Sequence, residues 1–349
     1  MQKVQESPSY VQTSMAGAMS LGLASGRFLR GAKCTCLNLL LVYQNGCRAA
    51  CSYCGLACNR DATAARTFIR VKWPTFSLEE ILGKLRTSQH SFKRACVSMI
   101  TQPRSVVDTC IIIKELRDQG TVPVSALLTP TAMKPGRDLA LIRAAGADRV
   151  GIAIDAATEK LFEQHRGRGV QGPHRWERYW ETVVEAVDLF GQYHAGVHLI
   201  VGLGETEREM VQAIARAYRI GALTHLFSFF PEAGSRLEDW QRPAMGQYRR
   251  LQLARYLIDE GIIDEDCLKY DAAGRITGFG LDIEPYVQSG LAFMTSGCPG
   301  EDGLPACNRP FGNERASEPL RNYPFVPKPE DVAVIGNQIW GGEQSHARA

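Results

Sequence analysis

Short apolar runs alternate along the chain with longer stretches in which apolar residues recur every three or four positions. The apolar runs have the length of strands and the longer stretches have the period of amphipathic helices. The predicted strands are 36–43, 94–100, 122–129, 148–155, 196–203 and 223–230, and the predicted helices are 77–88, 106–120, 136–146, 175–191, 205–221 and 244–261. Strand–helix units in series predict an α/β fold with a parallel sheet and right-handed crossovers.

The predicted sheet is either a partial or complete TIM-like barrel or an open doubly wound sheet. Upstream of the first strand, residues 14–33 have the spacing of a weakly amphipathic helix that ends in basic residues. Beyond residue 290 the composition changes to Gly, Pro and Asn, which predicts a loop-rich cap. We therefore expect a helical extension over 1–33, a βα domain over 34–290 and a C-terminal cap over 291–349.

Composition and charge narrow the function classes. The 349 residues are 45% hydrophobic and 22% charged, and the net charge of +3 is too small to indicate binding to nucleic acid or to a membrane surface. The longest apolar run, 36–43, is too short to cross a membrane. No basic region followed by an apolar one marks the N-terminus as a secretory signal, so we expect a cytoplasmic protein.

Four of the eleven cysteines lie close together just after the first predicted strand. Cys47, Cys51 and Cys54 have the spacing C-x3-C-x2-C, and Cys58 follows. Cytosolic thiols stay reduced, so such a group indicates metal or redox chemistry. Three thiolates can hold three irons of a [4Fe–4S] cluster and leave the fourth iron open. The alternative is a zinc site completed by Cys58, although a structural zinc knuckle normally pairs with a distant second one.

This motif, with Tyr53 before its third cysteine and with its place after the first strand of a βα series, resembles that of the radical S-adenosylmethionine (SAM) superfamily. The resemblance covers roughly residues 35–235 and implies a βα barrel of radical SAM type. It implies that SAM chelates the open iron and that one electron, from a donor such as ferredoxin or flavodoxin, releases a 5′-deoxyadenosyl radical. The cofactor carries that chemistry, and the protein orients it and excludes water.

The same resemblance assigns candidate SAM-binding residues. Tyr53 and the glycines of "HLIVGLGET", Gly202 and Gly204, would meet the adenine, where glycine allows close approach of the backbone. In "MITQP", Thr101 and Gln102 would bind the amino group, although this stretch departs from the acidic one expected there.

Two further SAM contacts follow from the loops after the fourth predicted strand. Asp155, at the end of "GIAIDAAT", would bind the ribose, and its alternative role is a helix N-cap. A basic residue would face the SAM carboxylate. The candidates are Arg166, Arg168, His174 and Arg175, of which we favour Arg175, and the alternative for all four is a solvated loop.

Two outlying pairs, Cys34 with Cys36 and Cys298 with Cys307, could bind an auxiliary iron–sulfur cluster. Closure of the barrel would bring its first and last strands together and so join the pairs. In the related biotin synthase and lipoyl synthase branch, such a cluster donates sulfur. The alternative is that these are scattered reduced thiols, as we expect for Cys96 and Cys110.

The whole chain most resembles one component of the two-protein lipoyl synthases, through "RGVQGPHRWERYW", "HLFSFFPEAGS" and the ending that contains Cys298 and Cys307. This implies sulfur insertion into an octanoyl chain on a carrier protein, together with a second radical SAM partner. The alternatives are radical SAM methylation, hydroxylation or rearrangement of a small metabolite or pigment, and a non-catalytic iron–sulfur or zinc scaffold.

Overall fold

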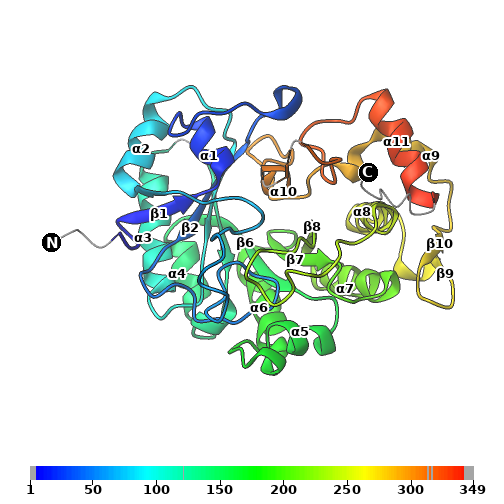
Figure 1. Ribbon diagram of the computed structural model, residues 1–349, viewed down its shortest axis with the longest axis horizontal. Coiled ribbons are helices and arrows are strands. Elements are labelled where there is room, and N and C mark those ends of the chain that lie inside the picture. The colour runs from blue at the N-terminus through cyan, green and yellow to red at the C-terminus, as the bar shows by residue number, and fades with distance from the viewer. Residues whose placement is uncertain (1–4, 121, 313, 316, 342–349) are drawn as a thin grey trace.

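A single eight-stranded sheet curves through the protein, with helices packed on its outer side (Figure 1). The computed structural model describes residues 5–120, 122–312, 314–315 and 317–341. The strand order is β3-β1-β2-β4-β5-β6-β7-β8. All six predicted strands are present, as β2, β4, β5, β6, β7 and β8. Each of them pairs in parallel with the next in this order. The fold is therefore the α/β, partial-barrel arrangement that the alternation predicts.

The bounds of the elements are as follows. The strands are β1 Tyr10–Thr13, β2 Cys36–Leu41, β3 Thr75–Ser77, β4 Arg94–Ser98, β5 Val124–Leu128, β6 Ala147–Asp155, β7 Ala195–Val201, β8 Leu223–Ser228, β9 Lys269–Tyr270 and β10 Ile276–Gly278. The α-helices are α1 Met15–Ser20, α2 Leu78–Thr87, α3 Ser105–Asp118, α4 Asp138–Ala144, α5 Glu159–His165, α6 Trp176–Phe190, α7 Glu207–Ile220, α8 Met245–Asp259, α9 Glu284–Ser289, α10 Arg309–Gly312 and α11 Pro329–Trp340. Short 3-10 turns lie at Leu29–Gly31, Pro130–Ala132, Arg168–Val170, Glu265–Cys267 and Leu291–Phe293.

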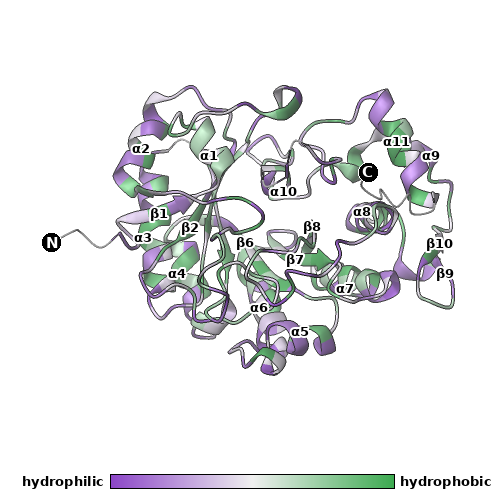
Figure 2. Ribbon diagram, in the orientation of Figure 1, coloured by the Kyte–Doolittle hydropathy of each residue, from purple (hydrophilic) through white to green (hydrophobic). Residues whose placement is uncertain are grey.

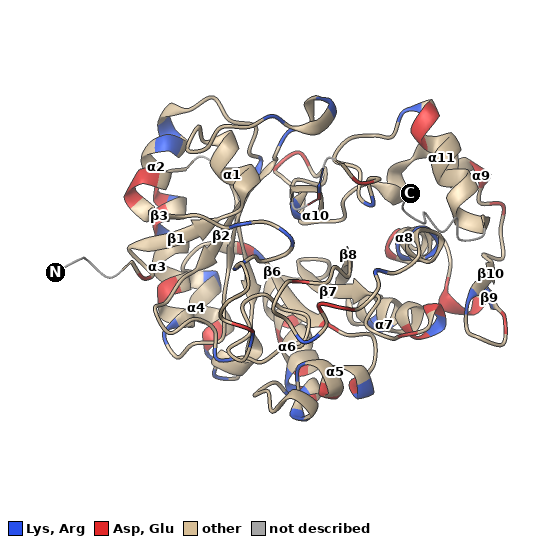
Figure 3. Cartoon of the chain, in the orientation of Figure 1, with Lys and Arg blue, Asp and Glu red and all other residues tan. Residues whose placement is uncertain are grey.

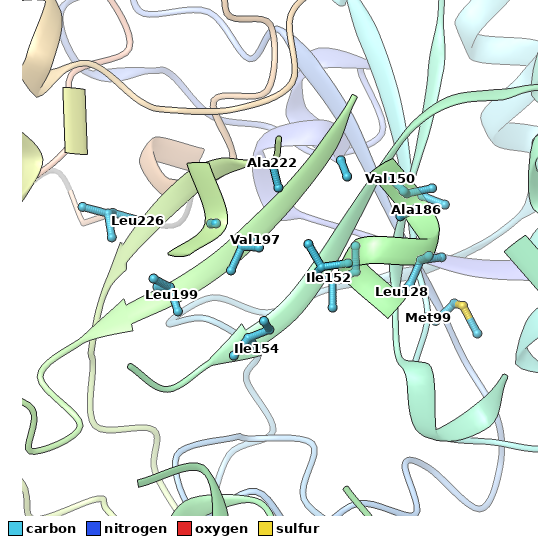
Figure 4. Packing of buried hydrophobic residues seen from close by; sticks show 14 of the residues in the cluster. Met99, Leu128, Val150, Ile152, Ile154, Ala186, Val197, Leu199, Ala222 and Leu226 are labelled. Atoms are coloured by element: carbon cyan, nitrogen blue, oxygen red, sulfur yellow. The ribbon is translucent and has the colours of Figure 1, made fainter. Parts of the chain in front are cut away.

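Side-chain alternation divides each parallel strand between two environments. In β6, Val150, Ile152 and Ile154 pack under the outer helices, as Figure 4 shows beside Ala186 of α6. The intervening residues of β6, among them Ala153 and Asp155, face the interior of the barrel and line a cavity. The contacts between the outer face of the sheet and the helices form the hydrophobic core. The inner face of the sheet lines the cavity and carries the candidate functional residues.

The six helices predicted after the strands are present and begin within two residues of their predicted starts. The Ser77 hydroxyl accepts a hydrogen bond from the Glu80 amide and caps α2. Thr206 and Glu209 form a full capping box at the start of α7. Both helices carry hydrophobic and hydrophilic residues (Figure 2), and the buried ones are mainly hydrophobic, such as Ile81 and Leu85 of α2 and Met210 and Ile214 of α7. Lys, Arg, Asp and Glu are found on the helices around the sheet (Figure 3). Within the described residues, no helix combines the length and apolar character that crossing a membrane requires.

The N-terminal region differs from the predicted helical extension. Helix α1 covers only Met15–Ser20, and the remainder of 21–33 is mostly turns and one 3-10 turn. Ahead of it, Tyr10–Thr13 forms β1, which pairs antiparallel with β2 and β3 at the edge of the main sheet. Glycines at positions 22 and 31 have φ of +69° and +70°, a conformation that interrupts a helix and explains its early end.

Among the described residues, no strand pairing closes the barrel, so the predicted meeting of the first and last strands does not occur. The C-terminal segment instead joins β2 and β8, the two ends of the parallel part of the sheet. The Thr35 amide donates to the Asn308 side chain at 3.0 Å, and the Thr35 hydroxyl donates to the Ala306 carbonyl at 2.6 Å. At the β8 end, the Leu226 amide donates to the Ser296 hydroxyl at 3.3 Å. The segment that carries Cys298 and Cys307 therefore lies between β2 and β8.

Candidate functional site

A large cavity opens at the carboxyl ends of the parallel strands. Its empty space, including the open mouth, is about 1110 Å³. All three motif cysteines line it, namely Cys47, Cys51 and Cys54. Cys58 is exposed and does not line the cavity. The fourth zinc ligand that the alternative interpretation requires therefore lies outside the cavity that the other three cysteines line.

The loop after β2 holds the three cysteines in a compact turn. The Ala49 amide donates to Cys47 Sγ and the Leu56 amide donates to Cys54 Sγ, each at 3.4 Å. Gly55 is required at its position, because a Cβ there would lie 2.0 Å from the Thr67 carbonyl oxygen. A backbone N–H that donates to sulfur stabilises the ionised thiolate, which is the form that binds a metal.

The three thiols form a group that favours a cationic occupant, with Cys51 buried and Cys47 and Cys54 half-buried. Burial raises the pKa of Cys54 well above its ordinary value, and the neighbouring Cys51 and Cys47 raise it further. Burial likewise raises the pKa of Cys51 to about 12, while the Arg166 guanidinium opposes the rise. Three adjacent thiolates are unfavourable without a metal, since the metal supplies the compensating charge. The donor set therefore fits a cluster held by three cysteines.

A hydrogen-bonded network of polar side chains lies beside the cysteines in the cavity lining. Asp155 Oδ2 accepts from the Tyr53 hydroxyl at 2.5 Å and from Arg166 Nη1 at 2.7 Å. Asp155 has φ of +66°, a strained conformation for a non-glycine residue at the end of β6. Arg166 is buried and also donates to the Tyr179 hydroxyl at 3.2 Å. The network presents one buried cation and one carboxylate to a ligand in the cavity.

The other predicted SAM-binding residues divide into two groups. Thr101 lines the cavity, whereas Gln102 does not; its side-chain amide donates to the Gly46 carbonyl and fixes the cysteine loop. Gly202 and Gly204 also lie outside the lining, with φ of +107° and +109°. These glycines shape the turn after β7, where a Cβ on Gly202 would lie 2.8 Å from Pro243.

The four basic candidates for the SAM carboxylate differ in whether they reach the cavity. The Arg175 guanidinium donates to the carbonyls of Gly172 and His174 on its own loop, and the residue is exposed. Arg166 and His174 line the cavity. Burial, with Arg166 and Arg175 adding to it, lowers the pKa of His174 well below its ordinary value, so His174 is neutral there.

A second, smaller cavity lies deeper in the barrel and is lined by Cys96, Cys298 and Cys307. Cys36 does not line this cavity, but its thiol is close enough to Cys307 for each to shift the pKa of the other. Cys36 and the nearby Arg309 lower the pKa of Cys307 to about 7, against the effect of burial. These four thiols come from the amino-terminal half of the sheet and from the C-terminal segment. Three of them are predicted auxiliary ligands, and Cys96 is an addition.

Cys34, the fourth predicted auxiliary ligand, is placed differently. It precedes β2, and its thiol donates to the Cys36 carbonyl at 3.3 Å. The expected extended geometry, which would point both thiols to one face, begins only at Cys36. Cys110 lies on α3 and lines neither of the two cavities.

One histidine and one arginine lie in the wall between the two cavities. His198 and Arg309 line both of them, as do Leu127 and Phe227, so the cavities share a wall. His225 lines the deeper one, and burial lowers its pKa to about 4. His225 Nδ1 and two nitrogens of Arg309, Nε and Nη2, are buried without a hydrogen-bond partner among the described residues. Such orphaned donors and acceptors indicate a polar occupant in the deeper cavity.

Over the described ranges, no three His, Cys, Asp or Glu side chains surround a point as a single metal ion requires. Cysteines that hold a cluster each bind a different iron and so surround a larger volume.

Sequence reasoning missed Cys96, His198 and His225. A usable signal was present, because these residues alternate with apolar ones inside otherwise apolar strands. Polar residues in that phase belong to the interior of the barrel.

Comparison with known proteins agrees with this fold and motif. The family model of the radical SAM superfamily matches residues 41–217, just over half of the chain. The chain therefore belongs to the radical SAM superfamily and is a radical SAM enzyme, and membership implies a [4Fe–4S] cluster and SAM. No curated protein matches the chain.

Solved structures provide more distant similarity. Methylornithine synthase (PylB) is 14% identical, with a TM-score of 0.48 over 69% of this chain and 66% of that protein. HydG, a maturase of the [FeFe]-hydrogenase, is 13% identical, with a TM-score of 0.46 over 62% and 47%. The radical SAM methyltransferase TsrM from Kitasatospora setae is 12% identical, with a TM-score of 0.41 over 80% and 57%. The chain spans less than two thirds of each of these proteins.

The buried cation in the first cavity leads to a prediction about SAM binding. We expect Arg166→Gln to weaken SAM affinity at least tenfold, because a charge-assisted bond to a carboxylate contributes about 1.5–3 kcal/mol. Arg175→Gln is the matched control and is expected to leave affinity within about twofold, on the same scale. Equilibrium dialysis with reconstituted, unreduced protein measures both. Loss of affinity in Arg175→Gln alone would restore the sequence-based assignment.

Proposed function

We propose that the chain inserts sulfur into an octanoyl chain that is amide-linked to a lysine of a carrier protein, with an auxiliary iron–sulfur cluster as the sulfur source. One observation carries the proposal: two groups of thiols lie in adjoining cavities of one barrel. Cys47, Cys51 and Cys54 line the outer cavity, and three thiols line the inner one, with Cys36 next to Cys307. A substrate bound between the two groups would face the SAM-derived radical on one side and the sulfur of the auxiliary cluster on the other.

In this proposal the outer cavity is the SAM site. Cys47, Cys51 and Cys54 would hold the [4Fe–4S] cluster, which with SAM supplies a 5′-deoxyadenosyl radical when bound. Arg166 would pair with the carboxylate of SAM, and Asp155 would bind the ribose, with Tyr53 and Arg166 holding its carboxylate in place. Thr101 is available for the amino group at the same wall. Fixed polar groups of this kind position the reacting atoms without reorganisation.

The proposed auxiliary ligands are Cys36, Cys96, Cys298 and Cys307. Arg309 lies next to this group, over the rings of Phe68 and Trp73, and one of its nitrogens donates to the Ser98 hydroxyl at 3.0 Å. Its two unpartnered nitrogens can donate to an anionic cluster, and its charge offsets the thiolates. Relative to the sequence-based set, Cys96 takes the place of Cys34.

The wall of the outer cavity suits an acyl chain. Its apolar lining includes Met99, Leu127, Ile200, Phe227 and Phe229. Such a surface binds an unbranched hydrocarbon by burial alone and gives no hydrogen bond that would hold water near a radical. The partners in this proposal are the octanoylated carrier protein, a second radical SAM enzyme and a cytoplasmic electron donor such as ferredoxin or flavodoxin.

Turnover on a defined substrate tests this proposal. An octanoyl-lysyl peptide from a carrier domain is incubated anaerobically with reduced protein and SAM, with and without the partner enzyme, and is analysed by mass spectrometry. We expect a mass increase of one sulfur per event together with 5′-deoxyadenosine. Deoxyadenosine formation without any sulfur in the peptide, under every pairing, would disprove the lipoyl assignment and leave the radical SAM assignment intact.

A further inference from the structure

Two histidines lie side by side inside the barrel, where the two cavities meet. His198 of β7 and His225 of β8 are register partners, and their rings meet edge to face with centres 5.3 Å apart. His198 lines both cavities, and His225 lines the inner one. The His198 ring also stacks on Phe227, with centres 5.1 Å apart. The two imidazoles therefore belong to the surface that an occupant of the inner cavity would contact.

Two glycines of neighbouring strands make room for these rings. A Cβ on Gly151 of β6 would lie 3.0 Å from His198 Nε2, and a Cβ on Gly196 of β7 would lie 2.6 Å from His225 Nε2. Glycine inside a strand weakens it and often marks a close approach of other groups. A larger residue at Gly196 would require the His225 ring to move. The inner face of the sheet is thus shaped around both imidazoles.

The protein itself leaves hydrogen-bonding capacity on both rings unused. His225 is 7% exposed, and its Nδ1 is buried without a hydrogen-bond partner among the described residues. Over the same described ranges, the rings of His165 and His174 are hydrogen-bonded, whereas the His198 ring has no hydrogen bond. Unused polar groups in a buried wall indicate an occupant that bonds to them.

Both rings are neutral. Burial, with His225 and Arg309 adding to it, lowers the pKa of His198 well below its ordinary value, and burial likewise lowers the pKa of His225. A neutral imidazole has one N–H donor. Each ring can therefore donate one hydrogen bond into the inner cavity, beside the thiols of Cys96, Cys298 and Cys307 that line it.

We propose that His198 and His225 each donate a hydrogen bond to a sulfur of the auxiliary cluster and so raise its reduction potential. Hydrogen bonds to sulfur are among the features that set the potential of an iron–sulfur cluster, because they stabilise its more negative, reduced form. The inference rests on the proposed function, which supplies the cluster. His198 also borders the outer cavity, so the sulfur that it contacts is the one that faces a substrate there. Both histidines are positioning residues.

A redox titration of the reconstituted holoenzyme, followed by electron paramagnetic resonance, tests this role. His198→Phe and His225→Phe keep a ring and remove its N–H, so we expect each to shift the potential of the auxiliary cluster to more negative values. His198→Gln retains an N–H donor, and its shift is expected to be smaller. His194→Gln, in the exposed position just before β7, is the matched control and should give the wild-type potential. The cluster held by Cys47, Cys51 and Cys54 serves as the internal control.

Turnover of octanoyl-lysyl peptide gives a second readout. His198→Phe should release about tenfold more 5′-deoxyadenosine per sulfur inserted, with about eight irons per chain retained. Unchanged potential and unchanged coupling in both phenylalanine variants would overturn the role of the histidines and leave sulfur insertion intact. Loss of iron from both variants would also overturn it, because a hydrogen-bond donor is not a ligand. About four irons in the wild type would contradict the auxiliary cluster itself, and this inference with it.

Discussion

Replacement of Cys51 by alanine is expected to abolish SAM cleavage and to remove the [4Fe–4S] cluster held by the motif. Cys51 is buried and lines the outer cavity with Cys47 and Cys54, and no other thiol of the described residues lines that cavity. A cluster with an open iron needs all three cysteines, since each binds a different iron. Production of 5′-deoxyadenosine by reduced protein, measured by chromatography, should fall below detection.

Cys58→Ala provides the control in the same loop. Cys58 is exposed and its amide donates to the Ala49 carbonyl, so only the backbone of this residue supports the loop. We expect this variant to cleave SAM at the wild-type rate. If Cys51→Ala still forms deoxyadenosine, or if Cys58→Ala loses it, the assignment of ligands in the motif is wrong.

The second large effect is expected from the inner thiols. Cys96→Ala, Cys298→Ala and Cys307→Ala should each lower the iron content by about half, from about eight to about four per chain, if each cube carries four irons. SAM cleavage should persist, because none of these residues contributes to the outer group of cysteines. With octanoyl-lysyl peptide, these variants should release deoxyadenosine without adding sulfur.

Cys34→Ala tests which thiols bind the auxiliary cluster. The Cys34 thiol donates a hydrogen bond to the Cys36 carbonyl, so we expect full iron content and full sulfur insertion when it is removed. Iron and sulfide analysis after anaerobic reconstitution measures the effect in all four proteins. Loss of iron in Cys34→Ala with retention in Cys96→Ala would return the auxiliary site to the set inferred from sequence.

Much of the fold could be predicted because local signals and burial agree. Strands such as 94–98 and 223–228 are short runs in which buried apolar residues alternate with others, and the helices between the strands carry caps and an apolar face. The N-terminal region could not be predicted in the same way. Residues 10–13 are a strand only through antiparallel pairing with β2 and β3, a non-local interaction that leaves little trace in a short segment.

The site was predictable where spacing determines chemistry. Cys47, Cys51 and Cys54 share one loop, so their proximity follows from the sequence alone. The inner group depends on how distant segments pack: Cys36, Cys96 and Cys307 meet because the C-terminal segment fills an open seam, not because the barrel closes. Loop conformation likewise decides between Arg166 and Arg175, since both lie in one basic stretch and only one of them turns inward.

The iron and sulfide content of wild-type protein after anaerobic reconstitution tests the central claim most directly. We propose two clusters in one barrel, one held by Cys47, Cys51 and Cys54 and one by Cys36, Cys96, Cys298 and Cys307. We therefore expect about eight irons and about eight sulfides per chain, with a Mössbauer spectrum of [4Fe–4S] clusters. About four irons would contradict the auxiliary cluster, and zinc without iron would contradict both clusters.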